Sequence, residues 1–274
     1  MRNLLIFATL FSFSLFIQTA LSAQDNDPPT SYHSLDYIKV APGMYNDYLK
    51  LEKAWNKIHA ANIKAGKYNQ WVMDEVLYPR GANAEYDFIT RHAFRGEKQL
   101  TAYMEGAFFP EDWEALLTHE EMALVRRTGE IRTIVKSEIW SSADGVFADD
   151  YADAKIHVFN FFDRPAGKSR ADHFKAERDI WKPVHQARID AGTMKGWFLL
   201  GMVFPYGANM EYQDATVDVY SSVADYFADG MIDTFNKVHP GKDANQLINS
   251  TWESATLIRG EVRMMIDRIT KENI

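Results

Sequence analysis

The stretch WNKIHAANIKAG at residues 55–66 returns as WKPVHQARIDAG at residues 181–192. When residues 55–90 are compared with residues 181–216 without gaps, 14 of the 36 positions are identical, whereas unrelated chains would share about two. The identical pairs include Trp55/Trp181, His59/His185, Gly66/Gly192, Trp71/Trp197 and Tyr86/Tyr212. A repeat of this length indicates that one structural unit occurs twice in the chain.

The similarity extends on both sides of this block. YHSLDYIKVAPG at residues 32–43 aligns with IHVFNFFDRPAG at residues 156–167, and GEIR at 129–132 aligns with GEVR at 260–263. We therefore expect one unit over residues 31–140 and a second over residues 154–274. The polar, acidic stretch at 141–153 is typical of a linker.

The first 23 residues have the order of a secretory signal peptide. Arg2 precedes an apolar run, small residues end at Ala23, and the run is short for a membrane span of about 20 residues. We expect cleavage after Ala23, a flexible lead-in over residues 24–30, and a secreted or periplasmic protein without a membrane anchor.

The amino-acid composition excludes several classes of catalytic and metal-binding site. The 274 residues include no cysteine, which excludes thiol catalysis and cysteine-ligated zinc or iron–sulfur sites, and the net charge of −8 argues against a nucleic-acid partner. The sequence has no HExxH, G-x-S-x-G or Gly-rich phosphate motif, so no metal site is predicted. The 7 Trp, 13 Tyr and 17 Phe suit a large core or a cavity with aromatic walls.

Each unit shows the same order of predicted elements. In the first unit, strands are expected at residues 32–40, 70–78, 85–94 and 130–139, with helical regions at 44–65 and 97–127, and Gly66 and Gly192 as helix stops. The order β-α-β-β-α-β is that of a ferredoxin-like fold, whose sheet has helices on one face only. Two such sheets packed face to face would cover each other. The predicted fold is therefore α+β, with two tandem ferredoxin-like repeats forming one pseudo-two-fold α/β barrel.

This element order and duplication resemble the dimeric α/β-barrel superfamily, which includes monooxygenases, haem-degrading enzymes and chlorite-dismutase-like haem proteins. The resemblance covers most of the chain after the signal peptide and rests on no residue-specific motif. It implies a ligand cavity between the sheets but no particular reaction. Haem is compatible with the resemblance, and no motif in the sequence argues for it.

Strand alternation suggests which side chains face the cavity. One face of the strand at residues 85–94 is aromatic and polar and includes Tyr86, Thr90 and His92; the matching face of the second unit includes Tyr212, Thr216 and Asp218. We expect these residues in the lumen, with the other face beneath the helices. Because His92 and Asp218 occupy equivalent positions but differ, they are the candidate catalytic acid and base. The alternative is that they only complete polar networks at the barrel ends.

Two further pairs are candidate ligand-binding residues. Arg132 and Arg263 could clamp a carboxylate or phosphate, or could pair with Glu130 and Glu261 as structural ion pairs. His59 and His185 lie at the edge of the apolar stripe of their helices. They are either structural donors, for instance to the nearby turn, or proton carriers or haem or metal ligands near the barrel mouth. His33 and His157, also paired by the repeat, are equally ambiguous.

Two functions follow from these observations. The first is an exported barrel that binds a small apolar or aromatic molecule between its two sheets. The second is an oxygenase-type enzyme, cofactor-independent or haem-dependent, that uses a histidine in the lumen. Both interpretations allow for a homo-oligomer.

Overall fold

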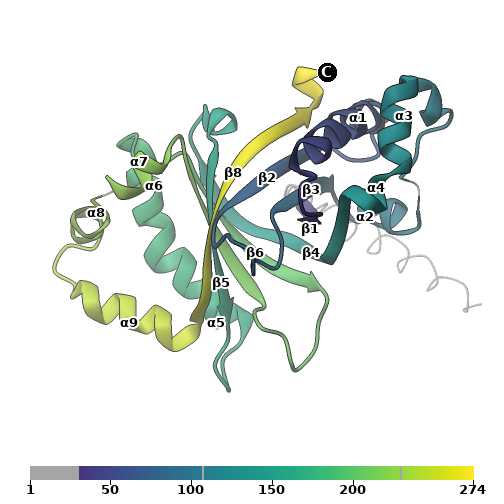
Figure 1. The fold of residues 1–274 in the computed structure, drawn as a ribbon. Coiled ribbons are helices and arrows are strands. Elements are labelled where there is room, and N and C mark those ends of the chain that lie inside the picture. The colour runs from purple at the N-terminus through teal and green to yellow at the C-terminus, as the bar shows by residue number, and fades with distance from the viewer. Residues whose placement is uncertain (1–30, 107, 229) are drawn as a thin grey trace, which may run out of the picture.

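The computed structural model describes residues 31–106, 108–228 and 230–274. The predicted signal peptide and lead-in lie outside the described residues. A central barrel separates two groups of helices, α1–α4 on one side and α5–α9 on the other (Figure 1). No helix within the described ranges has the length and apolarity needed to cross a membrane.

The first half of the chain contributes four strands to the barrel. They are β1 (Ser31–Val40), β2 (Gln70–Tyr78), β3 (Phe88–Arg95) and β4 (Arg132–Phe147). Helix α1 (Tyr45–Lys64) connects β1 to β2, and the segment between β3 and β4 holds α2 (Glu97–Met104), η1 (Trp113–Leu116), α3 (His119–Arg126) and α4 (Thr128–Ile131). The predicted element order is confirmed, but β4 continues to Phe147, so residues 141–147 of the expected linker are strand.

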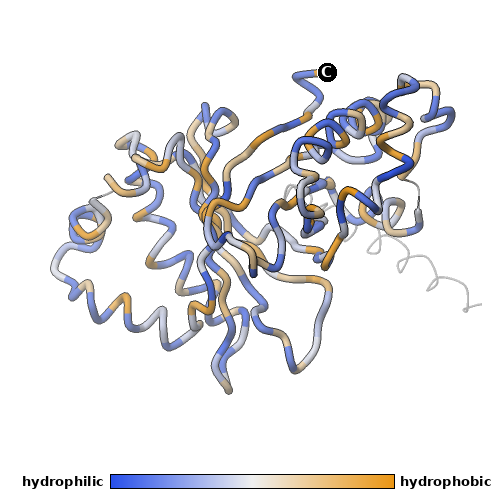
Figure 2. The backbone as a smooth tube through the Cα atoms, in the orientation of Figure 1, coloured by the Kyte–Doolittle hydropathy of each residue, from blue (hydrophilic) through white to orange (hydrophobic). Residues whose placement is uncertain are grey.

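The second half contributes the other four strands. They are β5 (Ile156–Asp163), β6 (Gly196–Phe204), β7 (Asp214–Tyr220) and β8 (Thr256–Thr270). The helices are α5 (Arg170–Ala176), the π-turn η3 (Glu177–Trp181), α6 (Lys182–Asp190), α7 (Val223–Phe227), α8 (Met231–Val238) and α9 (Ala244–Ser254), with short 3₁₀ turns η2 (Tyr151–Asp153) and η4 (Lys271–Asn273). Apolar and polar residues alternate along these helices (Figure 2), as expected for helices with one buried face.

The described strands form a closed antiparallel barrel in the order β1-β3-β2-β8-β5-β7-β6-β4. The two blocks β4-β1-β3-β2 and β8-β5-β7-β6 are joined along two seams, β2 with β8 and β4 with β6. Closure leaves no unpaired edge within this sheet, which removes the usual site of aggregation. The α+β class and the barrel between two four-stranded blocks agree with the prediction.

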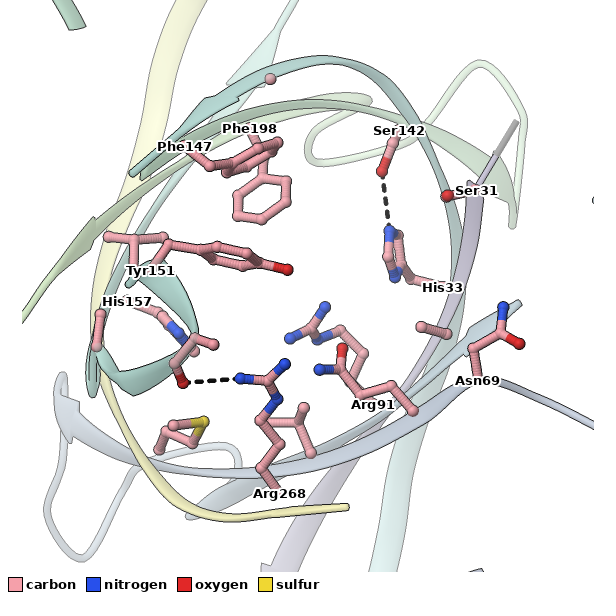
Figure 3. Close-up of a pocket in the computed structure, with 18 of the residues that line it drawn as sticks. Ser31, His33, Asn69, Arg91, Ser142, Phe147, Tyr151, His157, Phe198 and Arg268 are labelled. Carbon is pink, nitrogen blue, oxygen red and sulfur yellow. Dashed lines mark hydrogen bonds between the residues drawn. The ribbon is translucent and has the colours of Figure 1, made fainter. Parts of the chain in front are cut away.

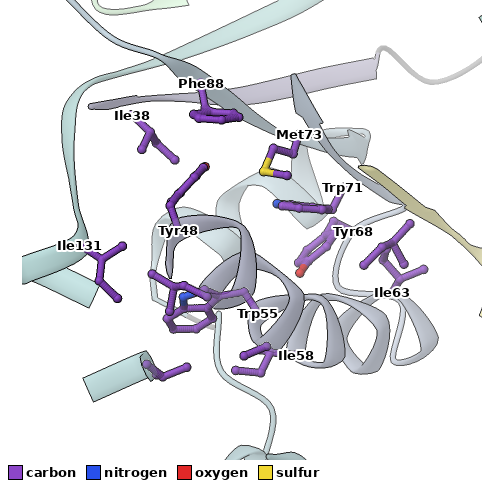
Figure 4. Close-up of a cluster of buried hydrophobic side chains, with 14 of the residues drawn as sticks. Ile38, Tyr48, Trp55, Ile58, Ile63, Tyr68, Trp71, Met73, Phe88 and Ile131 are labelled. Carbon is purple, nitrogen blue, oxygen red and sulfur yellow. The ribbon is translucent and has the colours of Figure 1, made fainter. Parts of the chain in front are cut away.

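Helix α1 shows how sequence pattern and packing combine. Its buried residues Tyr48, Leu51, Ile58 and others repeat at helical spacing and pack on the outer face of β3, where Phe88 lies 4.6 Å from the Tyr48 ring (Figure 4). Burial of each such side chain contributes about 1.5–3 kcal/mol relative to exposure. The helix ends at Lys64 with Ala65 as its C-cap, and Gly66 follows with φ of +75°, a conformation that glycine adopts without strain.

The alignment of GEIR with GEVR is wrong. Arg132 begins β4 and pairs with Val40 at the end of β1, whereas Arg263 pairs with His157 near the start of β5. Glu130 lies in α4, before the strand begins. Three identities in four residues are too few to fix the register of the last strand of each half.

Candidate functional site

The predicted lumen residues Thr90 and His92 lie on the outer face of β3, beneath the helices. The His92 ring is fully enclosed by aromatic side chains, with centroids 4.9 Å from Tyr68 and 5.2 Å from Tyr103. Burial lowers the pKa of His92 to about 3, and both of its ring nitrogens are buried without a hydrogen-bond partner among the described residues. The prediction that His92 faces a ligand between the sheets is therefore wrong.

The error arises where β3 begins. Tyr86 and Ile89 both belong to the cluster inside the barrel although they are three residues apart, and the ladder with β1 starts only at Phe88. Asp87 stands between them and bridges the neighbouring strands through its backbone, since its N–H donates to Ile38 and its carbonyl accepts from Val76. Strict alternation counted from Tyr86 therefore assigns every later residue to the wrong face.

The same shift occurs in the second half. Tyr212 and Ala215 both lie inside the barrel, whereas Thr216 and Asp218 line a pocket of about 430 Å³ on the outer side, between the sheet and the helices. There Asn160 donates to the Thr216 hydroxyl at 3.3 Å and to the Asp218 carboxylate at 3.4 Å. The prediction that Thr216 and Asp218 face the lumen is wrong as well.

His59 and His185 are buried structural residues of the helix–sheet interface. His59 stacks on Trp71 at 4.6 Å and its Nδ1 lies 2.8 Å from the Tyr68 hydroxyl. His185 stacks on Trp197 at 5.4 Å, and burial lowers its pKa to about 3. The repeated Trp and His thus form a stacked pair that fixes each helix on its sheet, rather than a bond to the nearby turn.

Tyr86, Tyr212 and Arg263 do lie inside the barrel, where they close one end of it. The Tyr212 hydroxyl donates to Glu138 at 2.6 Å, the Tyr86 hydroxyl donates to Glu261, and Arg263 donates to Glu261 at 2.7 and 3.0 Å. Although burial alone would raise it, the pKa of Glu261 is held below its ordinary value by the Arg263 charge and the Tyr86 hydrogen bond. These groups are engaged with one another, so this end of the lumen is a paired polar core.

Arg132 lies elsewhere and does not face the lumen. Its Nε is 3.1 Å from Glu52 of α1, whose side chain is 2% exposed. Burial raises the pKa of Glu52 to about 7 despite the neighbouring guanidinium. Arg132 therefore forms a structural ion pair that holds α1 against the sheet, but its partner is Glu52 rather than the predicted Glu130.

The opposite end of the barrel opens into a cavity of about 730 Å³ (Figure 3). Its walls come from both halves of the chain and from η2, and they combine cationic, hydroxyl, amide and aromatic side chains. The lining includes His33, Gln70, Arg91, Ser142, Phe147, Tyr151, His157, Phe198 and Arg268. A cavity of this size, with a few convergent polar groups, is the usual form of a small-molecule site.

His157 and Asp74 form a dyad at this cavity. Nδ1 of His157 lies 3.2 Å from Asp74, and Nε2 makes no hydrogen bond to any described residue. Burial alone would raise the pKa of Asp74, but its interaction with the His157 ring and the Arg91 and Arg263 charges hold it below its ordinary value. An ionised carboxylate behind one ring nitrogen leaves the other free to exchange a proton with a bound molecule.

His33 lines the cavity from the neighbouring wall of the lumen. Its Nε2 lies 2.9 Å from the Ser142 hydroxyl. Burial, reinforced by the Arg91 charge, lowers the pKa of His33 to about 3, so the ring is neutral at ordinary pH. His33 thus offers hydrogen-bonding polarity without charge.

Two guanidinium groups complete the polar wall. Arg268 donates to the Ala152 carbonyl at 2.7 Å and, with the Gln70 amide oxygen turned toward it, to Gln70 at 2.7 and 3.1 Å. Arg91 makes no hydrogen bond to a described residue and extends into the cavity beside Arg268 (Figure 3). Tyr151 of η2 points its hydroxyl into the same space from the far wall.

Sequence reasoning missed most of this site. A buried arginine on the face assigned to the helices was the available signal for Arg91, because a helix–sheet interface rarely holds an unpaired charge. The repeated pair His33/His157 was noticed but not placed. Nothing in the sequence indicates that Tyr151, in the segment expected to be a linker, folds back over the barrel mouth.

The histidines and carboxylates of these pockets bear on whether the barrel can hold a metal ion or haem. The described residues contain no group of three or more His, Asp or Glu side chains that could hold a metal ion. At the open end of the barrel, the cavity of about 730 Å³ offers Nε2 of His157, with Asp74 behind the other ring nitrogen. In the outer pocket the histidine is His185, whose Nδ1 lies 3.3 Å from the Arg188 guanidinium, a fixed charge that opposes an iron cation.

Comparison with known proteins gives a fold but no close relative. No family model matches the chain, and no curated protein matches it. A proposed monooxygenase from Fusobacterium nucleatum aligns with a TM-score of 0.55 and 8% identity, covering 90% of this chain and 97% of its own. A proposed monooxygenase from Lactobacillus acidophilus aligns with a TM-score of 0.51 and 11% identity, covering 88% and 97%. The chain therefore has the dimeric α/β-barrel fold that its sequence predicted.

Proposed function

We propose that this protein binds a small organic molecule in the open end of its barrel. The observation that carries the proposal is the cavity of about 730 Å³, where aromatic walls meet the His157–Asp74 dyad and Arg91. The expected ligand is more polar than the apolar molecule inferred from sequence, because cationic and hydroxyl groups share the wall with Phe147 and Phe198.

Native mass spectrometry of protein purified from its source organism tests the proposal. The wild type should carry a small-molecule adduct. Ala93 lines the cavity, so Ala93→Trp should fill it and remove the adduct, whereas Ala82→Trp at the exposed turn should retain it. Equal adduct levels in both folded variants would place the ligand outside the lumen and refute the proposal.

An oxygenase-type activity without cofactor is the second candidate, and the His157–Asp74 dyad favours it. In this scheme His157 accepts a proton from an acidic C–H or O–H of the bound substrate, and the resulting anion reacts with dissolved oxygen. Oxygen uptake with anthrone as the probe tests it: Asp74→Asn should reduce the protein-dependent rate, whereas Glu75→Gln on the same strand should not. A rate that is the same with and without protein would exclude the activity on this probe and leave binding as the function.

We also propose a tandem duplication and export of the protein, neither of which depends on the identity of the ligand. The equivalent pairing of His33 with Ala93 and of His157 with Val219, at the same steps of their ladders, supports a tandem duplication with pseudo-two-fold symmetry. We also propose export to the periplasm or the medium with cleavage after Ala23. N-terminal sequencing of the protein from its host should find Gln24 as the first residue, and a retained Met1 would contradict export by this route.

A further inference from the structure

Arg91 is the most unusual charged residue of the barrel. It stands in the middle of β3, between Leu35 of β1 and Val72 of β2. Its guanidinium reaches the cavity and makes no hydrogen bond to a described residue. A guanidinium has five donors in a fixed fork, so an acceptor in the cavity would complete its bonding.

Positive charges outnumber negative charges around Arg91. Asp74 is the nearby carboxylate, but it also serves His157. Arg268 adds a second positive charge, and its bonds go to neutral acceptors. Arg263 is paired with Glu261. Burial lowers the pKa of Arg91, with Arg268 and Arg263 acting in the same direction and Asp74 and Tyr151 against it.

Asp144 lines the mouth of the cavity, but its negative charge does not neutralise Arg91. Its carboxylate accepts from Lys182 at 2.7 Å, from Arg178 at 3.0 Å and from the backbone of Gly145 at 2.8 Å. It is therefore already matched by two cations. An anionic ligand group would supply the missing negative charge in the lumen.

The shape of the cavity indicates what accompanies that anion. Beyond Arg91 and His157 the lumen continues into a small apolar chamber of about 30 Å³, enough for about one water-sized group. The chamber is lined by Leu35, Phe159, Leu200 and Val217, and toward the mouth Phe147, Tyr151 and Phe198 form an aromatic wall. An organic anion with a flat apolar body matches these surroundings better than an inorganic ion.

We infer that the cavity recognises a small aromatic carboxylate, whose two oxygens accept the fork of Arg91 while its ring packs against Phe198. The inference rests on the proposed binding function and names the ligand class for that site. The Tyr151 hydroxyl, on the far wall, is placed to donate to the same anion (Figure 3). Carboxylates and phosphates both match the planar fork bidentately, and the single negative charge of a carboxylate balances the single positive charge of Arg91.

Isothermal titration with phenylacetate, phenylacetamide and phenyl phosphate tests the inference. Phenylacetate should bind the wild type at least about tenfold more tightly than its neutral amide, the effect of one charge-assisted pair. Arg91→Met should abolish this preference and Arg91→Lys should retain part of it. Arg126→Met removes the same charge from an exposed position of α3 and should change nothing.

The outcomes separate the two proposals, with near-ultraviolet circular dichroism confirming that each variant is folded. If the amide binds as well as the acid and Ala93→Trp blocks both, the binding function stands and the carboxylate inference falls. If phenyl phosphate alone is preferred, the cavity is an anion site of another class and the inference also falls. If no probe binds and the native protein carries no adduct, both proposals fail.

Discussion

Replacement of Asp214 by alanine should be among the most destabilising single changes in this chain. Asp214 begins β7 and is fully buried. Its carboxylate accepts from Arg164 Nη1 at 2.9 and 2.8 Å, from Arg170 Nε at 2.8 Å, and lies 3.1 Å from His173 Nδ1. One carboxylate thus fixes the end of β5 and the whole of α5 to the barrel.

The expected loss follows from what the substitution leaves behind. Burial alone would raise the pKa of Asp214, but His173, Arg164 and Arg170 hold it below its ordinary value, so the carboxylate is ionised at neutral pH. Removing one partner of a buried ion pair costs about 3–5 kcal/mol. Arg170 is 38% exposed, so its share is screened by solvent and the lower part of that range applies. At about 2–4 °C per kcal/mol, Tm should fall by roughly 6–15 °C.

Thermal unfolding followed by circular dichroism measures this loss, and Asp150→Ala is the matched control. Asp150 lies only 2.6 Å from Lys195 but is 58% exposed, so its removal should leave Tm near the wild-type value. Distance alone would predict the opposite ranking. Equal Tm values for the two variants would refute the reasoning that burial, not separation, decides the strength of these pairs.

Three further predictions concern other buried groups. His92→Phe should keep or raise Tm, because the ring loses no hydrogen bond; a fall of more than about 5 °C in calorimetry would show that His92 has a polar partner. Tyr212→Phe should lower the urea-derived free energy of unfolding by about 1.5–3 kcal/mol through loss of its bond to Glu138, whereas the exposed Tyr206→Phe should have no effect. The free energy of unfolding should decrease as pH falls from about 6.5 toward 3. Three buried imidazoles have a folded pKa of about 3, so over this range they bind protons in the unfolded chain but not in the folded one. A native near-ultraviolet spectrum at pH 3 would contradict this. The three are His33, His92 and His185.

The elements of the fold were predictable because their causes are local. The apolar stripe of α1, the glycine after it and the bulky strands are all readable from neighbouring residues, and the repeat added the second sheet. The face of β3 was not predictable in this way. The backbone of Asp87 is used by two other strands, and that use depends on where β1 and β2 lie in three dimensions.

The candidate site was less predictable than the fold for a related reason. His33 and His157 carry a visible signal in their repeated position, but their distinct roles depend on partners from other strands, Ser142 for one and Asp74 for the other. Tyr151 reaches the cavity because β4 continues beyond its expected end and returns the chain over the barrel mouth. These contacts join strands that are far apart in the sequence and form only when the barrel closes, so they cannot be predicted from any short stretch of sequence.

The seam between β2 and β8 has a consequence for how the chain acquires its structure on the ribosome. β2 emerges early, whereas β8 is the last strand of this sequence to be made. Until β8 has been made, β2 lacks its partner strand along one edge, and an unpaired strand edge is a template for aggregation. A chain cut short before residue 256 would therefore leave β2 and β5 each without one partner strand, so that both halves of the barrel are affected.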